Sequence, residues 1–239
     1  MPALQAPNQN TAFVLLVHER LAVVYGQAVA YFHDLDPLSE LVSALLSHRT
    51  RNSQSAKAYR NLVAAFPSWE EVRDAPVSAV EEAIAPCTWP EQKAPRIQQI
   101  LTLITEKRSQ LELDFLEPLP VAEARAWLEE LPGVGPKTSA AVLSFSSLRG
   151  RALPVDSHHF RVAWRLGIIL EKAGEAKAHA LLENLLPDTF TAQDVYNHHQ
   201  YLMRHGQDVC HWQNPKCRTC LLLDICPTGN AFLAKKVLN

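Results

Sequence analysis

Apolar residues recur at spacings of three and four along almost the whole chain, which is the period of amphipathic helices. Prolines lie at or near the ends of these segments, and no alternating pattern with hairpin turns indicates a strand. The pattern predicts an all-α protein with a loose tail from about residue 228. The expected helices are 11–26, 39–48, 56–66, 77–86, 94–108, 121–131, 137–147, 157–169, 175–186 and 192–205.

The chain is long enough for one large domain or two lobes, with 239 residues of which 47% are hydrophobic and 20% charged. No apolar stretch has the length of a signal peptide or a membrane span, so we expect a cytoplasmic protein without a membrane partner. The net charge of −2 argues weakly against nucleic acid. However, residues 48–60 carry four basic and no acidic side chains, whereas residues 112–130 carry six acids and one arginine. We therefore expect the protein to have one basic side and one acidic side.

Four of the five cysteines lie near the C-terminus with the spacing C-x6-C-x2-C-x5-C, and they are Cys210, Cys217, Cys220 and Cys226. Four thiolates this close in sequence can converge on one centre. A cytoplasmic chain disfavours disulfides, which leaves a four-cysteine zinc site or a [4Fe–4S] cluster. Zinc sites usually pair two C-x2-4-C knuckles, and only one is present here. The fifth cysteine, Cys87, is expected to be a buried thiol.

A tight turn is predicted in LPGVGPKT, where Gly133, Val134 and Gly135 separate two helices and Pro136 opens the second. The start of a helix carries the positive end of its dipole, so this turn can bind a phosphate. A plain helix–turn–helix corner is the structural alternative. Lys137 follows in the first helical turn, where the dipole and burial against DNA should favour the neutral amine. A neutral amine can attack a sugar C1′ and form a Schiff base. The structural alternative is a solvated surface lysine without a chemical role.

Asp156 comes nineteen residues after Lys137 and directly before a predicted helix. It is expected to cap that helix. It can also assist departure of a base and stabilise positive charge at C1′, and the two roles are compatible because capping would fix the side chain. His158 and His159 follow it and receive no catalytic role.

These stretches together resemble the endonuclease III family of helix–hairpin–helix DNA glycosylases: LPGVGPKTSAAVL, then VDSHHFRV, then HG-x3-C-x6-C-x2-C-x5-C. The resemblance implies two helical lobes, a six-helix barrel over 36–150 and a cluster lobe that joins 1–35 to 151–239. It implies a [4Fe–4S] cluster on the four cysteines, Lys137 as the nucleophile and Asp156 as the essential carboxylate. The implied partner is double-stranded DNA with a flipped-out damaged pyrimidine or an abasic site, bound by a monomer associated with the nucleoid.

The chain departs from the family pattern at several positions. Where family members usually read LS-x-Q-x-x-D, this chain has Arg49 and Asn52 in place of the Gln and Asp. Trp89 stands where a Leu is frequent, and it is either a wedge in the base stack or a core or rim aromatic. The cysteine loop keeps Lys216 and Arg218 as expected DNA contacts. These departures predict a narrowed or shifted substrate range, with lesions opposite guanine favoured, and slower turnover.

The resemblance implies a bifunctional glycosylase and β-lyase acting on oxidised pyrimidines. A thymine–guanine mismatch glycosylase and a non-catalytic DNA-binding protein are the alternatives. Adenine glycosylases of the superfamily lack the hairpin lysine, which disfavours that activity here. A protein that only binds DNA would require neither Lys137 nor Asp156.

Overall fold

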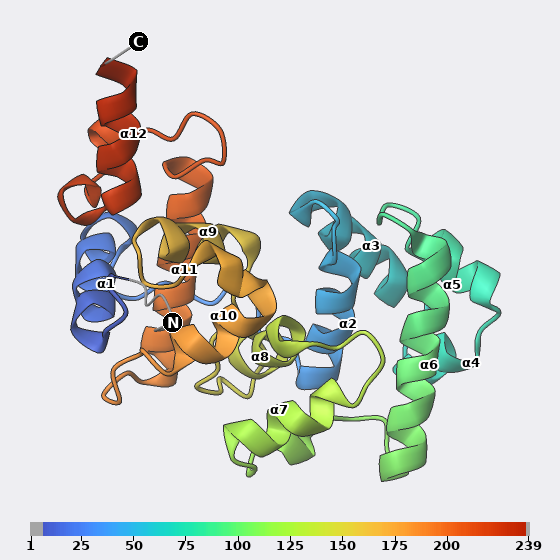
Figure 1. The fold of residues 1–239 in the computed structure, drawn as a ribbon. Coiled ribbons are helices and arrows are strands. Elements are labelled where there is room, and N and C mark those ends of the chain that lie inside the picture. The colour runs from blue at the N-terminus through green and yellow to red at the C-terminus, as the bar shows by residue number, and fades with distance from the viewer. Residues whose placement is uncertain (1–6, 238–239) are drawn as a thin grey trace. The chain divides into compact units, whose positions relative to one another are not determined.

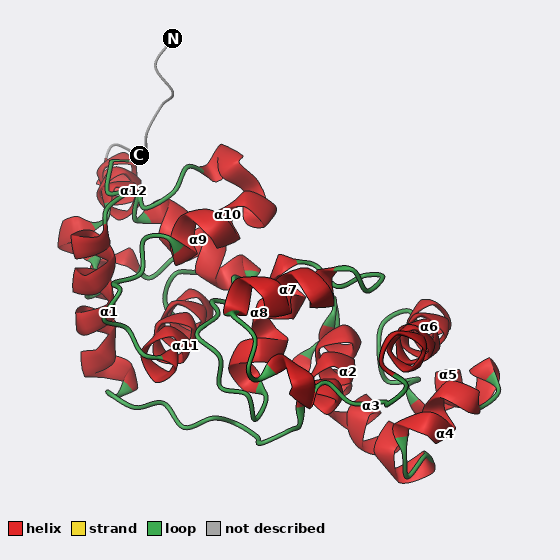
Figure 2. Cartoon of the chain, turned by 90° about the horizontal axis from the view of Figure 1, so that it is seen from below, coloured by secondary structure: helices red, strands yellow, loops and turns green. Residues whose placement is uncertain are grey.

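The computed structural model describes residues 7–237 and is entirely helical over that range, as expected (Figures 1 and 2). Four short 3-10 segments accompany the α-helices: η1 Asp114–Leu116, η2 Glu171–Ala173, η3 Cys217–Thr219 and η4 Leu223–Ile225. The α-helices are α1 Thr11–Tyr25, α2 Pro37–Ser47, α3 Asn52–Ala65, α4 Trp69–Asp74, α5 Val77–Ala83, α6 Pro90–Arg108, α7 Val121–Glu129, α8 Pro136–Phe145, α9 Ser157–Arg165, α10 Gly174–Glu183, α11 Ala192–Asp208 and α12 Pro227–Val237.

Three features of the helices differ from the pattern prediction. The expected loose tail is wrong, because α12 continues to Val237. Helix α6 begins at Pro90 rather than 94, so Pro95 lies inside it. Pro95 is exposed, and the carbonyl that its missing N–H leaves unpaired can be solvated. Helix α4 has six residues, which is too short for a helical period to be visible in the sequence.

The chain divides into two compact units. The first, here called the hairpin unit, comprises Phe32–Gly150 and is built on α2. Helix α2 packs against α3, α6 and α8, while α4 and α5 contact α6 and α7 contacts α8. Its core side chains include Leu41, Val42 and Leu46, which are fully buried. Asp36 caps α2 through the amides of Leu38 and Ser39 and so fixes where that central helix starts.

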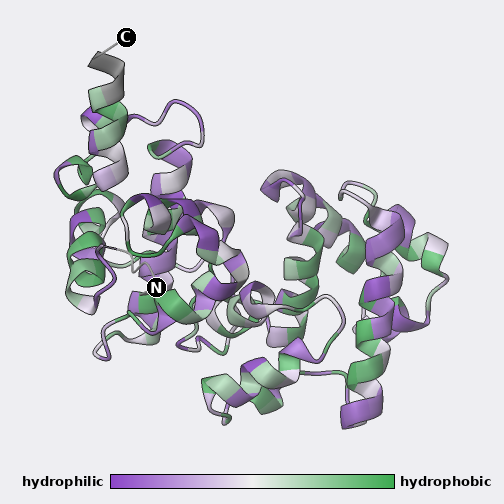
Figure 3. Cartoon of the chain, in the orientation of Figure 1, coloured by the Kyte–Doolittle hydropathy of each residue, from purple (hydrophilic) through white to green (hydrophobic). Residues whose placement is uncertain are grey.

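The second unit, here called the cysteine unit, comprises the described residues up to Tyr31 together with those from Arg151 onward. Helix α11 packs against α9 and α1, and α10 and α12 contact α9. Figure 3 shows apolar and polar positions mixed around these helices. The unit buries large side chains that carry polar groups, and Arg161, Tyr196 and Tyr201 are among its fully buried residues. Arg161 offsets its burial by donating to the carbonyls of Gly206 and Cys210, both at 2.7 Å.

None of the helices within residues 7–237 combines the length and the apolar character that a membrane crossing requires.

A group of histidines lies between α1, α9 and α11 in the cysteine unit, with His159 and His198 buried and His18 half-buried. The ring of His198 lies 5.6 Å from that of His18 and 5.6 Å from that of His159, centroid to centroid. Neither ring nitrogen of His159 has a hydrogen-bond partner among the described residues. Burial lowers the pKa of His198 to about 3, and it lowers the pKa of His159 and His18 as well, although Asp194 and Glu19 oppose the shift at His18. These rings are therefore neutral at neutral pH.

The buried histidines make the stability of the cysteine unit depend on pH. The folded pKa of His198 lies below the unfolded value near 6.5, so the unfolded chain binds more protons between these values. Stability is therefore complete above pH 6.5 and falls as the pH falls toward 3. At pH 5 this one ring should cost about 2 kcal/mol of unfolding free energy. His198→Phe keeps an aromatic ring without the titration, and urea unfolding at pH 8 and pH 5 should show a smaller loss than in wild type. An equal loss in both proteins would contradict the assignment.

Candidate functional site

A cavity of about 400 Å³ opens in the hairpin unit and gathers four of the residues that the sequence singled out. These are Arg49, Trp89, Gly133 and Lys137. Its size is that of a small-molecule site. The ten lining residues include four cationic side chains and no carboxylate, so the cavity is electropositive. The lining consists of Leu45, His48, Arg49, Trp89, Gln92, Lys93, Arg96, Ile97, Gly133 and Lys137.

The predicted hairpin forms one wall of this cavity. Gly133 has a φ of +83°, a conformation that side chains other than glycine rarely adopt, and a Cβ there would lie 2.7 Å from Nη1 of Arg96. Val134 is buried and donates its amide to the carbonyl of Leu131 at 3.1 Å, so its side chain anchors the turn from inside. Gly135 is the N-cap of α8 and offers no capping side chain. The positive end of α8 therefore stays open toward a ligand.

Lys137 lies in the first turn of α8, is exposed, and lines the cavity. The next residue, Thr138, is buried and forms a hydrogen bond through Oγ1 with Nε2 of His48 at 3.0 Å. Burial lowers the pKa of His48 to about 4, with smaller contributions from the charges of Lys137 and Lys93. His48 is therefore a neutral imidazole at neutral pH. It fixes the start of α8 relative to the end of α2.

Arg49 and Trp89 project from two different turns and meet at the cavity. Cζ of Arg49 lies 5.9 Å from the centroid of the Trp89 ring, within the range of a cation–π contact. Trp89 is 45% exposed, so it lies at the rim of the cavity and not in the core. Both residues have positive φ, 52° for Arg49 and 55° for Trp89. Asn52, the other departure in this stretch, is the first residue of α3.

The sequence reasoning missed His48, Lys93 and Arg96. A signal for the last two was present, because Trp89, Gln92, Lys93 and Arg96 are spaced by three and four and so share one face of α6. The pattern alone could not show that this face borders a cavity. Arg96 makes no hydrogen bond or ion pair with another described residue, and its guanidinium is exposed beside Gly133.

Asp156 lies in the cysteine unit, whereas Lys137 lies in the hairpin unit. It is the N-cap of α9, as predicted, and its carboxylate accepts from the amide of His159 at 2.7 Å. This bond fixes the orientation of a half-buried carboxylate. The preceding segment, Ala152–Val155, is fully buried or nearly so, which anchors the residue from its N-terminal side.

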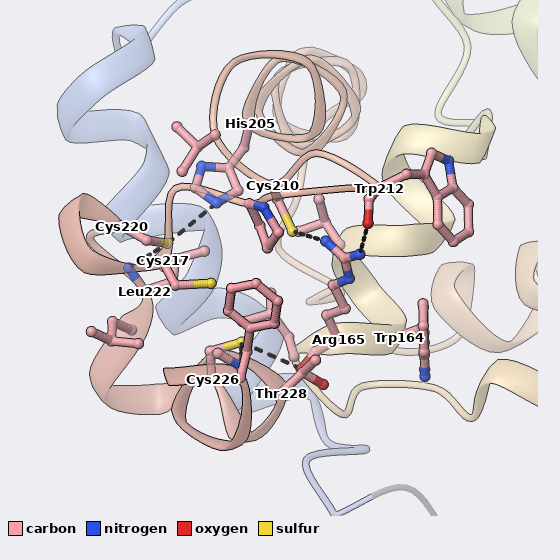
Figure 4. A pocket seen from close by; sticks show the side chains of 17 residues that line it. Trp164, Arg165, His205, Cys210, Trp212, Cys217, Cys220, Leu222, Cys226 and Thr228 are labelled. Atoms are coloured by element: carbon pink, nitrogen blue, oxygen red, sulfur yellow. Dashed lines mark hydrogen bonds between the residues drawn. The ribbon is translucent and has the colours of Figure 1, made fainter. Parts of the chain in front are cut away.

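The four C-terminal cysteines line one cavity of about 150 Å³ in the cysteine unit (Figure 4). Cys210 follows α11, Cys217 begins η3, and Cys226 precedes α12. Within residues 7–237, no group of three or more His, Cys, Asp or Glu side chains is placed to hold a metal ion as the side chains stand. The four thiols border this cavity, and four thiolates are the ligand set of either a zinc ion or a [4Fe–4S] cluster.

Hydrogen-bond donors point at three of these sulfurs. Arg165 Nη1 lies 3.3 Å from Sγ of Cys210. Backbone amides donate to the other two, that of Leu222 to Cys220 at 3.4 Å and that of Gly229 to Cys226 at 3.3 Å. Donors of this kind stabilise the thiolate form that a metal centre requires.

Burial acts in the opposite direction on the same thiols. It raises the pKa of Cys220 to about 11 and also raises that of Cys226. Without a cationic centre these two groups therefore stay protonated, and a bound cluster would supply the charge that deprotonates them. The donor set and the cavity together suit a [4Fe–4S] cluster.

Exposed side chains cover the segment from the first to the third of these cysteines, residues 210–220. Lys216 and Arg218 are both exposed, as a role in DNA contact requires. The indole of Trp212 is 54% exposed and lies 4.9 Å from Cζ of Arg161. Arg165 fixes this loop by donating to the carbonyls of His211 and Trp212.

Comparison with known proteins places this arrangement in a family. Residues 42–188 match the model of the HhH-GPD superfamily of base excision DNA repair proteins. A protein of Arabidopsis thaliana named as a DNA glycosylase is 37% identical over 63% of this chain, although the match spans only 51% of that protein. Endonuclease III of Thermotoga maritima is 31% identical over 81% of this chain and 84% of its own length. A solved endonuclease III trapped as a covalent DNA intermediate shares the fold, with a TM-score of 0.79, 23% identity and coverage of 94% of this chain and 99% of that one. The chain therefore belongs to the HhH-GPD superfamily of base excision DNA repair proteins.

Proposed function

We propose that the protein is a DNA glycosylase and abasic-site lyase that removes oxidised pyrimidines from double-stranded DNA. The observation that carries the proposal is the placement of Lys137 in an electropositive cavity, beside the hairpin and the exposed cations Arg49 and Arg96. Membership of a base excision repair superfamily supports the same activity. A binding module would gain affinity from the cations but would not require a nucleophile.

The chemistry follows from an amine at the cavity. The nitrogen of Lys137 attacks C1′ of the damaged nucleotide, the glycosidic bond breaks, and the base leaves with its bonding electrons and takes up a proton. The resulting aminal opens to a Schiff base. Loss of a proton from C2′ then breaks the C3′–O3′ bond, and the phosphate leaves on the downstream strand. Water releases the sugar fragment and regenerates the amine of Lys137.

We assign the assisting carboxylate to Asp156. A carboxylate stabilises positive charge that develops at C1′ as the base departs. Its bond to the amide of His159 fixes its orientation. Because Asn caps helices about as well as Asp, Asp156→Asn removes the charge and keeps the cap, so it separates the two roles of this residue.

We assign a [4Fe–4S] cluster to the four C-terminal cysteines, with a structural role. The cluster would hold the loop that carries Lys216 and Arg218 in place. Arg165 would support it from the protein side, since it contacts both the sulfur of Cys210 and the carbonyls of the loop.

The first prediction concerns this cluster. Purified protein should be yellow-brown, with a broad absorbance near roughly 400 nm and about four irons per chain. Cys220→Ala should lose the colour and lower the melting temperature, because the site ties η3, η4 and α12 together. Cys87→Ala is the matched control, since Cys87 lies in the hairpin unit, and it should keep full iron content. Colourless protein with stoichiometric zinc would reject the cluster.

The second prediction concerns the nucleophile. Borohydride should trap a covalent adduct between the protein and a duplex with an abasic site, and Lys137→Gln should abolish trapping while leaving DNA binding within about threefold. Lys107→Gln removes an exposed lysine of the same unit and should trap normally. Asp156→Asn should slow base removal from a duplex with one oxidised pyrimidine more than it weakens binding. Trapping that survives in Lys137→Gln would identify another amine as the nucleophile.

The third prediction concerns the base opposite the lesion. Arg49 makes no hydrogen bond or ion pair with another described residue, so its guanidinium donors are free to meet DNA. Because arginine only donates, it should favour an orphan guanine, whose edge presents two acceptors, by about tenfold. The measurement is incision of one lesion placed opposite each of the four bases, by wild type and by Arg49→Gln. If both proteins rank the four duplexes alike, Arg49 does not read the opposite base.

A further inference from the structure

Lys93 lies near the start of α6, and its ammonium group binds to a segment at the end of α2. Nζ donates to the carbonyl of Leu46 at 2.7 Å, to the carbonyl of His48 at 2.9 Å and to Oγ1 of Thr50 at 2.8 Å. An ammonium has three protons, so all of its donors are used. The three acceptors lie in residues 46–50, here called the α2–α3 turn. The end of a helix leaves carbonyls unpaired and negative, and Lys93 caps the end of α2 from a neighbouring helix.

The hydroxyl of Thr50 also connects the α2–α3 turn to a second turn, residues 87–89, here called the α5–α6 turn. The amide of Thr88 donates to Oγ1 of Thr50 at 3.1 Å, so Thr50 accepts from both Lys93 and Thr88. The amide of Lys93 itself donates to the carbonyl of Trp89 at 3.1 Å. The two turns are therefore tied to one another and to α6 through Lys93 and Thr50.

Each of the two turns presents one exposed residue in a strained conformation. Arg49, in the α2–α3 turn, has a φ of 52°, and Trp89, in the α5–α6 turn, has a φ of 55°. Large side chains rarely adopt this region, and they persist there only where the surroundings determine the backbone. The bonds of Lys93 and Thr50 supply that constraint. They also explain why the guanidinium of Arg49 and the ring of Trp89 meet at 5.9 Å.

We propose that Lys93 is a positioning residue for base recognition: its ammonium fixes the two turns so that Arg49 and Trp89 stand side by side at the cavity as one preformed reading surface. This rests on the proposed function in one respect, the role of Arg49 toward the opposite base. A preformed pair loses little conformational freedom on binding, so selectivity depends on the bonds that hold it. Burial lowers the pKa of Lys93, but the ammonium is the form that can make all three of these donations.

The test compares Lys93→Met with Lys107→Met, which makes the same change further along α6 at an exposed ion pair. Binding is measured on duplexes that carry a tetrahydrofuran abasic analogue opposite each of the four bases. The analogue has no C1′ hydroxyl, so binding is independent of the lyase reaction. Wild type and Lys107→Met should prefer guanine by about tenfold. Lys93→Met should reduce the preference to less than about threefold and should speed hydrogen exchange at the Thr88 amide.

A second arm separates positioning from general loss of stability. In an Arg49→Ala background, where the selectivity is already gone, Lys93→Met should change the ratios among the four affinities by less than about twofold. Thr50→Val, which removes the shared acceptor, should reproduce the loss of selectivity if Lys93→Met folds poorly.

The proposal is overturned if Lys93→Met keeps the wild-type ranking, if exchange at Thr88 is unchanged, or if the effect persists without Arg49. The proposal is also overturned if wild type binds the four duplexes equally well, even when borohydride traps Lys137. If trapping fails while wild type prefers guanine and Lys93→Met does not, the lyase is rejected and the positioning role is supported.

Discussion

Helix ends carry unpaired backbone groups, and the chemistry-bearing residues of this protein lie where those groups must be satisfied. Lys137 lies in the first turn of α8, Asp156 caps α9, Trp89 directly precedes α6, and Arg49 follows the end of α2. Two of the cysteines also lie at helix ends, since Cys210 follows α11 and Cys226 precedes α12. A helix end points a small number of groups in a fixed direction, so these ends hold the chemistry-bearing residues in defined orientations.

The way each end is satisfied determines what it can do. The start of α2 is closed by the carboxylate of Asp36 and takes no part in the cavity. The start of α8 has only Gly135 as its cap and stays open to an anion. The end of α2 is closed from outside by Lys93, which leaves Arg49 exposed. One open helix end, at α8, and one cross-helix cap, at the end of α2, thus border the electropositive cavity.

The cysteine unit resolves a conflict between burial and charge. Burial keeps the thiols of Cys220 and Cys226 protonated, yet amides and Arg165 point donors at the sulfurs. Both features become consistent when a positively charged centre lies among the thiols, because the donors then stabilise thiolates in a site of low dielectric. The same unit keeps its buried histidines neutral, so its interior carries few net charges away from the cysteines.

The sequence by itself determined the helical class, the spacing of the four cysteines and the residues of the hairpin. These signals are local: a period of 3.6, a Gly-Val-Gly turn and four thiols within one short segment report on neighbours in the chain. The exposed rim position of Trp89 and the capping bond of Asp156 required coordinates to establish, although both were among the alternatives that the sequence allowed.

Tertiary structure alone decided how distant segments share one cavity. Lys93 is 47 residues from Leu46, and His48 is 90 residues from Thr138, and no local pattern records either bond. Helix α12 also escaped the pattern, because its apolar side chains are explained by packing on α9, η3 and η4 and not by a visible period. A chain can encode which residues begin and end its helices, but which ends meet depends on the packing of all the helices at once.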